Sequence, residues 1–357
     1  MSDRKDTWTR VSPLIPPGVL RGKLPLPRES AEMISQARDM VRAVLGGADG
    51  RLLVIAGPCS VHDPAAALDY AGRLAALSRR HARDLLLVMR VYVEKPRTVT
   101  GWKGLANDPG LDGTCDVPGG LRLARELLLA IAALGLPAAT EWVDPATPAY
   151  LGDLVTWGAI GARTTESPVH RQLASGLDMP VGFKNGTDGD IQVAAEACLA
   201  ARAGHTFAGL ADDGTAAVIR TVGNPDCHLV LRGGRAGPNF DAPWVAKACA
   251  LAAGAGLARG VVVDASHGNS RKDHRRQEQV AAALAGQVAD GETGLAGVML
   301  ESNLAGGRQE PGDPATLAYG QSITDACMDW EATAALVGLL AAASRRRRSA
   351  PALWGTA

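Results

Sequence analysis

Several common signatures are missing from this sequence of 357 residues. Its six cysteines lie far apart and form no Cys-x-x-Cys pair, which disfavours both a disulfide scaffold and a thiolate zinc knuckle. The longest apolar run, residues 127–139, is shorter than the roughly 18 residues that a membrane span needs, and Gly135 and Pro137 interrupt it. The first residues lead into no apolar segment of a secretory signal. We therefore expect a cytoplasmic protein with no membrane partner.

An excess of charge of one sign is missing too, because 37 basic residues balance 37 acidic ones. Balanced charge gives no reason to expect nucleic acid as a partner. Neither a Gly-x-Gly-x-x-Gly spacing nor a P-loop occurs, so a nucleotide cofactor is not expected. The arginine run at residues 345–348 could contact nucleic acid, but cations at the C-terminus of a helix are favourable and solvated, and we favour that interpretation.

What the sequence does contain is an alternation of short aliphatic runs with amphipathic segments. Hydrophobic residues make up 46% of the chain, which is ample for a core. Eight runs are typical of strands: 51–59, 85–90, 136–141, 158–163, 180–184, 228–232, 260–264 and 297–301. Most segments between them predict helices. Asp63 and Ser167, each followed by proline, open two of these helices, and Asp241 and Asp325 can cap two more.

This alternation predicts a parallel sheet, and eight units favour a closed (β/α)8 TIM barrel over a doubly wound sheet. Residues 206–222 carry two short apolar runs around Asp212-Asp213-Gly214 and predict a small inserted β-hairpin. Residues 12–27 contain five prolines and predict an extended arm. We expect an N-terminal arm and helix over residues 1–48, one catalytic barrel over 49–345, and a disordered tail over 346–357.

Charged or ligating side chains end nearly every predicted strand. In chain order they are Cys59, Arg90, Glu141, Arg163, Lys184, Arg232, Asp264 (with His267 just beyond) and Glu301. In a barrel these ends converge on one face, where active sites lie. An aliphatic core does not require charges there. Four of the eight are cationic, which indicates a pocket for a multiply anionic substrate.

Four of the polar residues could bind a metal: Cys59, His267, Glu301 and Asp325. One thiolate, one imidazole and two carboxylates suit a divalent ion such as manganese, iron or cobalt, which can polarise a carbonyl. The spacing alone does not decide the matter. Each residue also has an ordinary interpretation, namely a buried thiol, a loop histidine, a surface glutamate and a helix-capping aspartate.

Five cations could hold phosphate and carboxylate groups: Arg90, Lys95, Arg163, Lys184 and Arg232. A solvated rim or salt bridges to neighbouring acids would be the ordinary alternative. The basic loop Glu94-Lys95-Pro96-Arg97-Thr98, followed by Gly101-Trp102-Lys103-Gly104, could bind a second phosphate or could be a plain surface loop.

At these motifs the chain closely resembles the type I 3-deoxy-D-arabino-heptulosonate 7-phosphate (DAHP) synthases of the shikimate pathway. The similarity covers roughly residues 30–345. It is carried by residues 56–64 (AGPCSVHDP), 89–98, 101–104, 158–166 (GAIGARTTE), 180–189 (PVGFKNGTDG), 227–234, 264–270 (DASHGNS), 297–303 and 319–327. Together these motifs are highly specific, so the resemblance implies the family's fold, activity and site.

The resemblance assigns roles by position. Cys59, His267, Glu301 and Asp325 match the ligands of a divalent metal (Mn²⁺, Fe²⁺ or Co²⁺). Arg90, Lys95, Arg163, Lys184 and Arg232 match residues that hold phosphoenolpyruvate. Lys95, Pro96, Arg97 and Thr98 match the loop that receives the phosphate of erythrose 4-phosphate. Glu141 matches an acid that can position water, and Lys95 or a metal-bound water would donate a proton to the aldose. We expect four of these residues to take part in catalysis: Lys95, Glu141, His267 and Asp325.

The family also implies a homodimer or homotetramer and an aromatic amino acid as effector. Here residues 1–17 match the family's regulatory N-terminal segment poorly, and Asp178 replaces a small polar residue near the inhibitor pocket. A carboxylate there should repel the carboxylate of an amino acid with no offsetting donor, so we expect weak or absent inhibition by phenylalanine. Tyrosine or tryptophan could still inhibit through a ring donor to Asp178, or Asp178 could point to solvent and have no effect. Two other functions are weighed against this one. A synthase of specialised metabolism would use a modified aldose, against which the intact loop from Lys95 to Thr98 argues. A non-catalytic sensor would be expected to lose metal ligands, and all four remain.

Overall fold

Eight parallel strands close into a barrel in the computed structural model, which describes residues 11–349. The strands are β1 (Leu52–Gly57), β2 (Leu85–Arg90), β3 (Ala138–Glu141), β4 (Trp157–Ile160), β5 (Val181–Lys184), β8 (Cys227–Leu231), β9 (Val261–Asp264) and β10 (Leu295–Glu301). Their order around the barrel is β1-β10-β9-β8-β5-β4-β3-β2. The predicted (β/α)8 barrel is confirmed, and each strand overlaps the run that predicted it.

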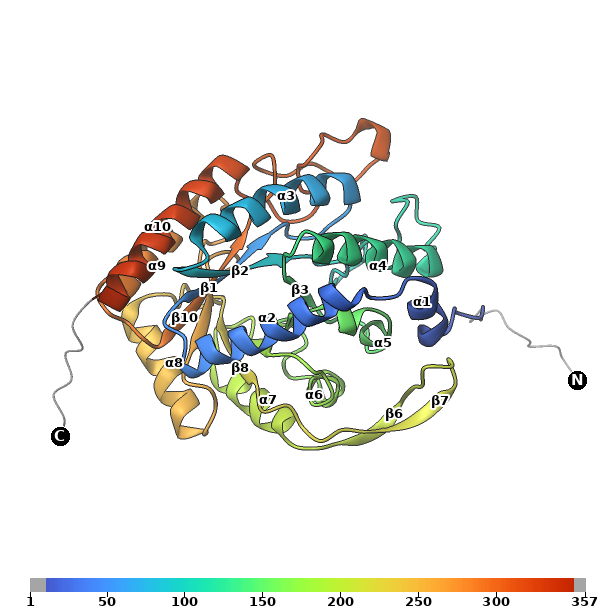
Figure 1. Ribbon diagram of the computed structural model, residues 1–357, viewed down its shortest axis with the longest axis horizontal. Coiled ribbons are helices and arrows are strands. Elements are labelled where there is room, and N and C mark those ends of the chain that lie inside the picture. The colour runs from blue at the N-terminus through green and yellow to red at the C-terminus, as the bar shows by residue number, and fades with distance from the viewer. Residues whose placement is uncertain (1–10, 350–357) are drawn as a thin grey trace, which may run out of the picture.

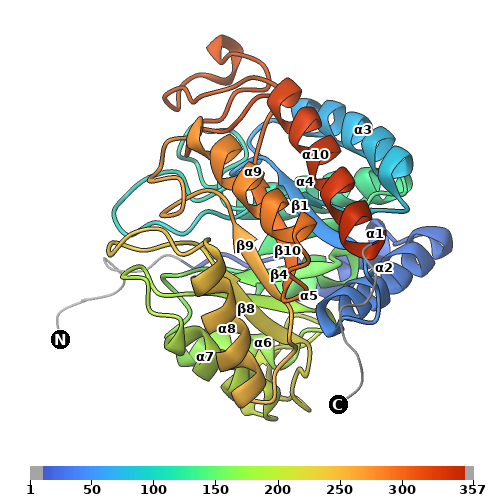
Figure 2. The same cartoon turned by 90° about the vertical axis from the view of Figure 1, so that its left-hand side faces the viewer.

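Every residue of these eight strands is buried, because side chains fill the barrel interior and helices cover the outside. The covering helices are α3 (Pro64–His81), α4 (Val117–Ala133), α5 (Thr147–Leu151), α6 (Pro168–Ala174), α7 (Gln192–Arg202), α8 (Ala242–Gly254), α9 (Arg276–Ala289) and α10 (Trp330–Ser349). Figure 2 shows α8, α9 and α10 outside the strands. Burial on both faces explains why these strands are unbroken aliphatic runs rather than alternating ones.

The predicted helix starts are confirmed at Asp63, whose carboxylate accepts from the backbone N–H groups of Ala65 and Ala66, and at Asp241. α6 begins after Ser167 as expected. The prediction for Asp325 is wrong, because Asp329 accepts from the Ala332 N–H (2.8 Å) at the start of α10. Asp325 lies earlier, in the loop from β10, where its carboxylate contacts Lys95.

The N-terminal segment covers the end of the barrel where the strands begin. α2 (Arg28–Gly46) buries Val41, Val44 and Leu45 there, and the Gly260 N–H donates to the Leu45 carbonyl (3.0 Å). The expectation of a wholly extended arm before α2 is wrong, since α1 (Pro17–Lys23) is helical. Pro17 occupies the first helical position, where the missing N–H breaks no hydrogen bond. Residues 1–10 of the arm lie outside the described residues.

The predicted hairpin is confirmed. β6 (Thr206–Leu210) and β7 (Ala216–Arg220) pair antiparallel and extend away from the barrel beyond α7 (Figure 1). No helix of the described residues is long and apolar enough to cross a membrane.

The expected boundary of the C-terminal tail needs correction, because α10 continues to Ser349. The arginine run is not simply solvated. Arg347 donates to the carbonyls of Glu292 and Leu295 (3.0 Å each), while Arg345 and Arg348 pair with Asp84. These bonds hold residues 346–349 against the barrel, and residues 350–357 lie outside the described part of the chain.

Candidate active site at the carboxyl ends of the strands

One pocket collects most of the residues that the sequence indicates. Its cavity volume is about 430 Å³, and it lies where the strands end. Strands β2, β3, β5 and β10 end at Arg90, Glu141, Lys184 and Glu301 respectively, so parallel pairing brings these side chains to one rim. The predicted residues that line the pocket are Arg90, Lys95, Pro96, Glu141, Arg163, Lys184, Arg232, His267, Glu301 and Asp325.

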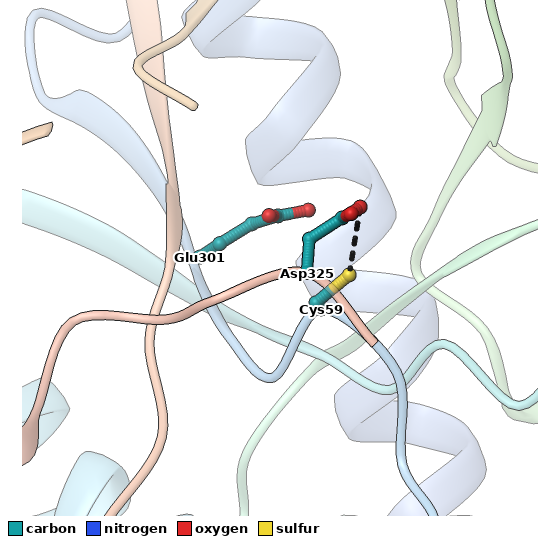
Figure 3. A group of neighbouring side chains, drawn as sticks. All are labelled: Cys59, Glu301 and Asp325. Atoms are coloured by element: carbon teal, nitrogen blue, oxygen red, sulfur yellow. Dashed lines mark hydrogen bonds between the residues drawn. The ribbon is translucent and has the colours of Figure 1, made fainter. Parts of the chain in front are cut away.

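Cys59, Glu301 and Asp325 form a compact group whose candidate ligand atoms all lie within 4.8 Å of one another. Glu301 ends β10 and pairs in register with Gly57 at the end of β1, so the turn after β1 carries Cys59 to its side. Asp325 comes from the loop before α10, and its carboxylate lies 3.5 Å from the Cys59 sulfur (Figure 3). A thiol and two carboxylates converge from three separate segments.

His267 lies beside this group without belonging to it. Its Nε2 is 3.6 Å from Glu301 Oε1. Its Nδ1 is held by Ser266 Oγ (2.6 Å) and Asp264 Oδ2 (3.0 Å), an arrangement that fixes the ring and leaves Nε2 for a ligand. The backbone of His267 has φ 56°, so a left-handed turn presents the ring. One nitrogen, one sulfur and two carboxylates fit a divalent first-row metal in donor type, and the sulfur and the carboxylates also fit it in position.

Lys95 contacts two of these four side chains. Its Nζ lies 2.8 Å from Cys59 Sγ and 3.1 Å from Asp325 Oδ2. Burial would lower the pKa of Lys95, but Cys59 and Asp325 raise it above its usual value. The charge of Lys95 in turn lowers the pKa of Asp325. Burial and the nearby Glu301 raise the pKa of the Cys59 thiol to about 12, so a metal ion that binds the sulfur must displace a proton.

Two of the pocket cations are almost completely buried and are paired. Arg90 lies 3.1 Å from Glu301 and stacks over the ring of Tyr92, and Lys184 donates to Asp264 (3.0 Å). Burial would lower the pKa of each, but Tyr92 and Glu301 raise that of Arg90, and Asp264 raises that of Lys184. Both therefore stay charged at neutral pH.

The remaining cations are more accessible. Arg232 is half-buried, and burial lowers its pKa, whereas Arg163 is exposed at the pocket wall. Arg163 donates to the carbonyl of Pro96 (3.5 Å), which joins this wall to the loop after β2. Arg97 and Thr98 of that loop are exposed and do not line the pocket; the Arg97 guanidinium packs against Gly101 instead.

Several residues in or beside the pocket were given no role by the sequence. Tyr92 lies two residues after Arg90, and that spacing on an extended chain could have indicated a shared face. Asp264 ends its strand, but only the structure reveals its contacts with Lys184 and His267. Lys272 and Arg308 reach the pocket from irregular loops that give no periodic signal.

Comparison with known proteins gives consistent matches. A sequence model of the DAHP synthetase I family matches residues 30–337. A phospho-2-dehydro-3-deoxyheptonate aldolase of Corynebacterium glutamicum is 52% identical over 334 residues, which is 91% of this chain and 90% of that protein. The Phe-sensitive and Tyr-sensitive aldolases of the same name from Escherichia coli K12 are 52% and 50% identical; the alignments span 95% and 91% of this chain, and 96% and 91% of theirs.

A solved structure agrees with these matches. The phospho-2-dehydro-3-deoxyheptonate aldolase of Francisella tularensis SCHU S4 superposes with a TM-score of 0.93 at 46% sequence identity. The superposition covers 95% of this chain and 99% of that one.

Proposed function

The chain belongs to the DAHP synthetase I family, and on that premise we propose a role for each group of residues in the pocket. It is a 3-deoxy-7-phosphoheptulonate synthase, which joins phosphoenolpyruvate, D-erythrose 4-phosphate and water and releases DAHP and phosphate in aromatic amino acid biosynthesis. The observation that best supports the assigned roles is that one pocket places all five predicted cations beside a group of candidate metal ligands.

Phosphoenolpyruvate would bind through Arg90, Arg163, Lys184 and Arg232. Guanidinium groups match carboxylate and phosphate oxygens in pairs, and lysine adds a point charge. Arg90 and Lys184 lie deepest, so the enol end of the substrate would be fixed in a site that water barely reaches. This arrangement stabilises the charge that moves to the departing phosphate.

The aldose would occupy the side of the pocket formed by Lys95 and Pro96, and the exposed Arg97 and Thr98 of the same loop would receive its phosphate. A divalent cation (Mn²⁺, Fe²⁺ or Co²⁺) held by Cys59, His267, Glu301 and Asp325 would supply a Lewis acid for the aldehyde oxygen. Lys95 lies within hydrogen-bond distance of Cys59 and Asp325, so its ammonium can give a proton to the aldose oxygen as the new carbon–carbon bond forms.

Water would then add to C2 of the former enol. Glu141 is buried at the end of β3, and Gly161 allows its carboxylate to lie there, since a Cβ at Gly161 would come within 2.3 Å of Glu141 Oε1. Glu141 would position this water and accept its proton. The resulting hemiketal phosphate loses phosphate by cleavage of the C–O bond, a step for which the protein needs no nucleophile of its own.

An aromatic amino acid effector and a homodimer or homotetramer complete the proposal. The relatives named for sensitivity to phenylalanine or tyrosine support regulation of this kind. A groove between α2 and the hairpin contains Asp178 and is the expected place for the effector. The cytoplasmic location stays a prediction.

Identification of the product tests the proposed function. Purified protein with Mn²⁺ should convert phosphoenolpyruvate and erythrose 4-phosphate to DAHP, detected by mass spectrometry. The same assay should be run with a panel of other phosphorylated aldoses as the second substrate, including an amino-substituted tetrose phosphate. We expect kcat/KM for erythrose 4-phosphate to be highest. A preference for the amino-substituted tetrose would instead indicate a synthase of specialised metabolism.

A further inference from the structure

Glu94 is a buried carboxylate to which the reaction assigns no role. It immediately precedes Lys95, and only 2% of its surface is exposed. Its oxygens accept three hydrogen bonds from the segment that follows β3 and runs into the first residue of α5. The Asp144 N–H (3.1 Å) and Thr147 Oγ1 (3.0 Å) donate to Oε1, and the Val143 N–H (3.3 Å) donates to Oε2. Every one of these donors lies about 50 residues away in sequence.

The backbone around Glu94 is enclosed as well. The Lys95 N–H donates to the Lys103 carbonyl (2.8 Å), and the Ala106 N–H donates to the Val93 carbonyl (3.0 Å), so these two bonds close the base of the loop. Gly104 has φ 111° and lies so near that a Cβ there would come within 2.6 Å of the Glu94 Cα. The loop can therefore move as a body only if the contacts of Glu94 break.

The two segments that Glu94 joins carry opposite parts of the reaction. Lys95 follows Glu94 directly, and Glu141 stands two residues before Val143. We propose that Glu94 is a positioning residue, which fixes the aldose loop at a set distance from Glu141 and so places the aldose against the enol carbon. This inference rests on the proposed function and deepens it, because it concerns the binding of the second substrate.

The chemistry of the contact requires a carboxylate. Two anionic oxygens can accept all three donors, whereas a glutamine offers one acceptor oxygen and turns an N–H₂ group toward a donor. Burial, together with the nearby charge of Asp144, raises the pKa of Glu94 to about 7. A carboxylate in this position is costly, and its three donors offset that cost only while the two segments stay together.

Kinetics of Glu94→Gln test the proposal. We expect KM for erythrose 4-phosphate to rise at least tenfold, while KM for phosphoenolpyruvate stays within twofold and the bound manganese per chain is unchanged. Glu94→Asp keeps the charge but shortens the reach, and it should lie between Glu94→Gln and the wild type. Glu32→Gln, at an exposed glutamate paired with Arg28 on α2, is the matched control and should leave both constants unchanged.

A second variant keeps the test independent of whether Glu94→Gln folds. Thr147→Val removes one donor at nearly constant volume and should raise KM for erythrose 4-phosphate two- to fivefold, again without affecting phosphoenolpyruvate. Unchanged constants in these variants, or equal rises for both substrates that follow a drop in melting temperature, would overturn the positioning role. An inactive wild type would instead contradict the proposed function itself.

Discussion

At the residue scale, the pocket arginines differ in how much water reaches them, and this difference should determine what each contributes to binding. A charge-assisted hydrogen bond is worth roughly 1.5–3 kcal/mol, or about one to two decades in affinity. Arg232→Ala should raise KM for phosphoenolpyruvate by nearly two decades because Arg232 is half-buried, and Arg163→Ala by about one because Arg163 is exposed. Steady-state kinetics measure both.

Arg122→Ala provides the control for these two variants, since Arg122 is an exposed arginine of α4 that pairs with Glu126. Its KM for phosphoenolpyruvate should equal that of the wild type. A KM within twofold of the wild type for Arg232→Ala, at unchanged kcat, would refute its assignment to the substrate.

Cys59 permits a second test at this scale. Cys59→Ala should lower the metal content of the purified protein, because the soft thiolate ligand is lost while the carboxylates remain. Elemental analysis after dialysis against a fixed manganese concentration measures this. Cys249→Ala removes a half-buried thiol of α8 that lies outside the candidate ligand group, and its metal content should match that of the wild type. Equal occupancy in Cys59→Ala would remove Cys59 from the ligand set.

At the scale of elements, the groove between α2 and the hairpin surrounds Asp178 with cations that the sequence did not predict. We expected Asp178 to repel a ligand carboxylate with no offsetting donor nearby. Instead Arg38 of α2 lies 3.0 Å from Asp178, and Arg42 lies 3.9 Å from it. Arg38 Nε and Nη2 donate to the carbonyls of Val155 and Gly152, so Asp178 occupies the remaining group, Nη1, which could otherwise donate to a ligand carboxylate. Weak inhibition by phenylalanine stays the prediction, now for this reason.

Asp178→Ser should free Nη1 of Arg38 to donate to the ligand carboxylate. We expect the variant to be inhibited by phenylalanine at a concentration at least threefold lower than the wild type requires, with unchanged KM values for both substrates. Inhibition curves at fixed substrate concentrations measure the difference. Strong inhibition of the wild type at sub-millimolar phenylalanine, or no change in the variant, would show that Asp178 does not limit binding.

The elements also show what the sequence can predict. Strand runs such as 85–90 are visible because burial on both faces leaves an unbroken aliphatic stretch, and each strand end then fixes where Arg90 or Lys184 points. Contacts between distant segments leave no such pattern. Arg38 meets Asp178 across 140 positions, and Ser344 donates to the Asp84 carbonyl across 260. The tail boundary and the contacts of Glu94 were missed for that reason.

At the scale of the whole molecule, one buried histidine should make stability depend on pH. Trp157 Nε1 can only donate, so Nε2 of His228 accepts from it (3.1 Å) and Nδ1 carries the proton toward the Asp226 carbonyl. Burial lowers the pKa of His228 to about 4. As pH falls below about 6.5, His228 takes up a second proton in the unfolded chain but not yet in the folded one. The folded state therefore loses stability until about pH 4.

The loss from His228 amounts to about 3 kcal/mol across that window. His228→Gln removes the titration, so its free energy of unfolding, although lower at pH 7, should fall less steeply between pH 6.5 and 4. Urea unfolding at a series of pH values measures both slopes. Parallel slopes would mean that His228 is not held neutral in the folded protein.

The central claim for the whole molecule is a metal-dependent condensation in one pocket. Its most direct test is the rate of phosphate release from phosphoenolpyruvate, measured with and without erythrose 4-phosphate, before and after treatment with chelator. We expect release only when both substrates are present, loss of activity after chelation, and recovery on addition of manganese or cobalt. Full turnover by a chelated enzyme in which elemental analysis detects no metal would contradict it.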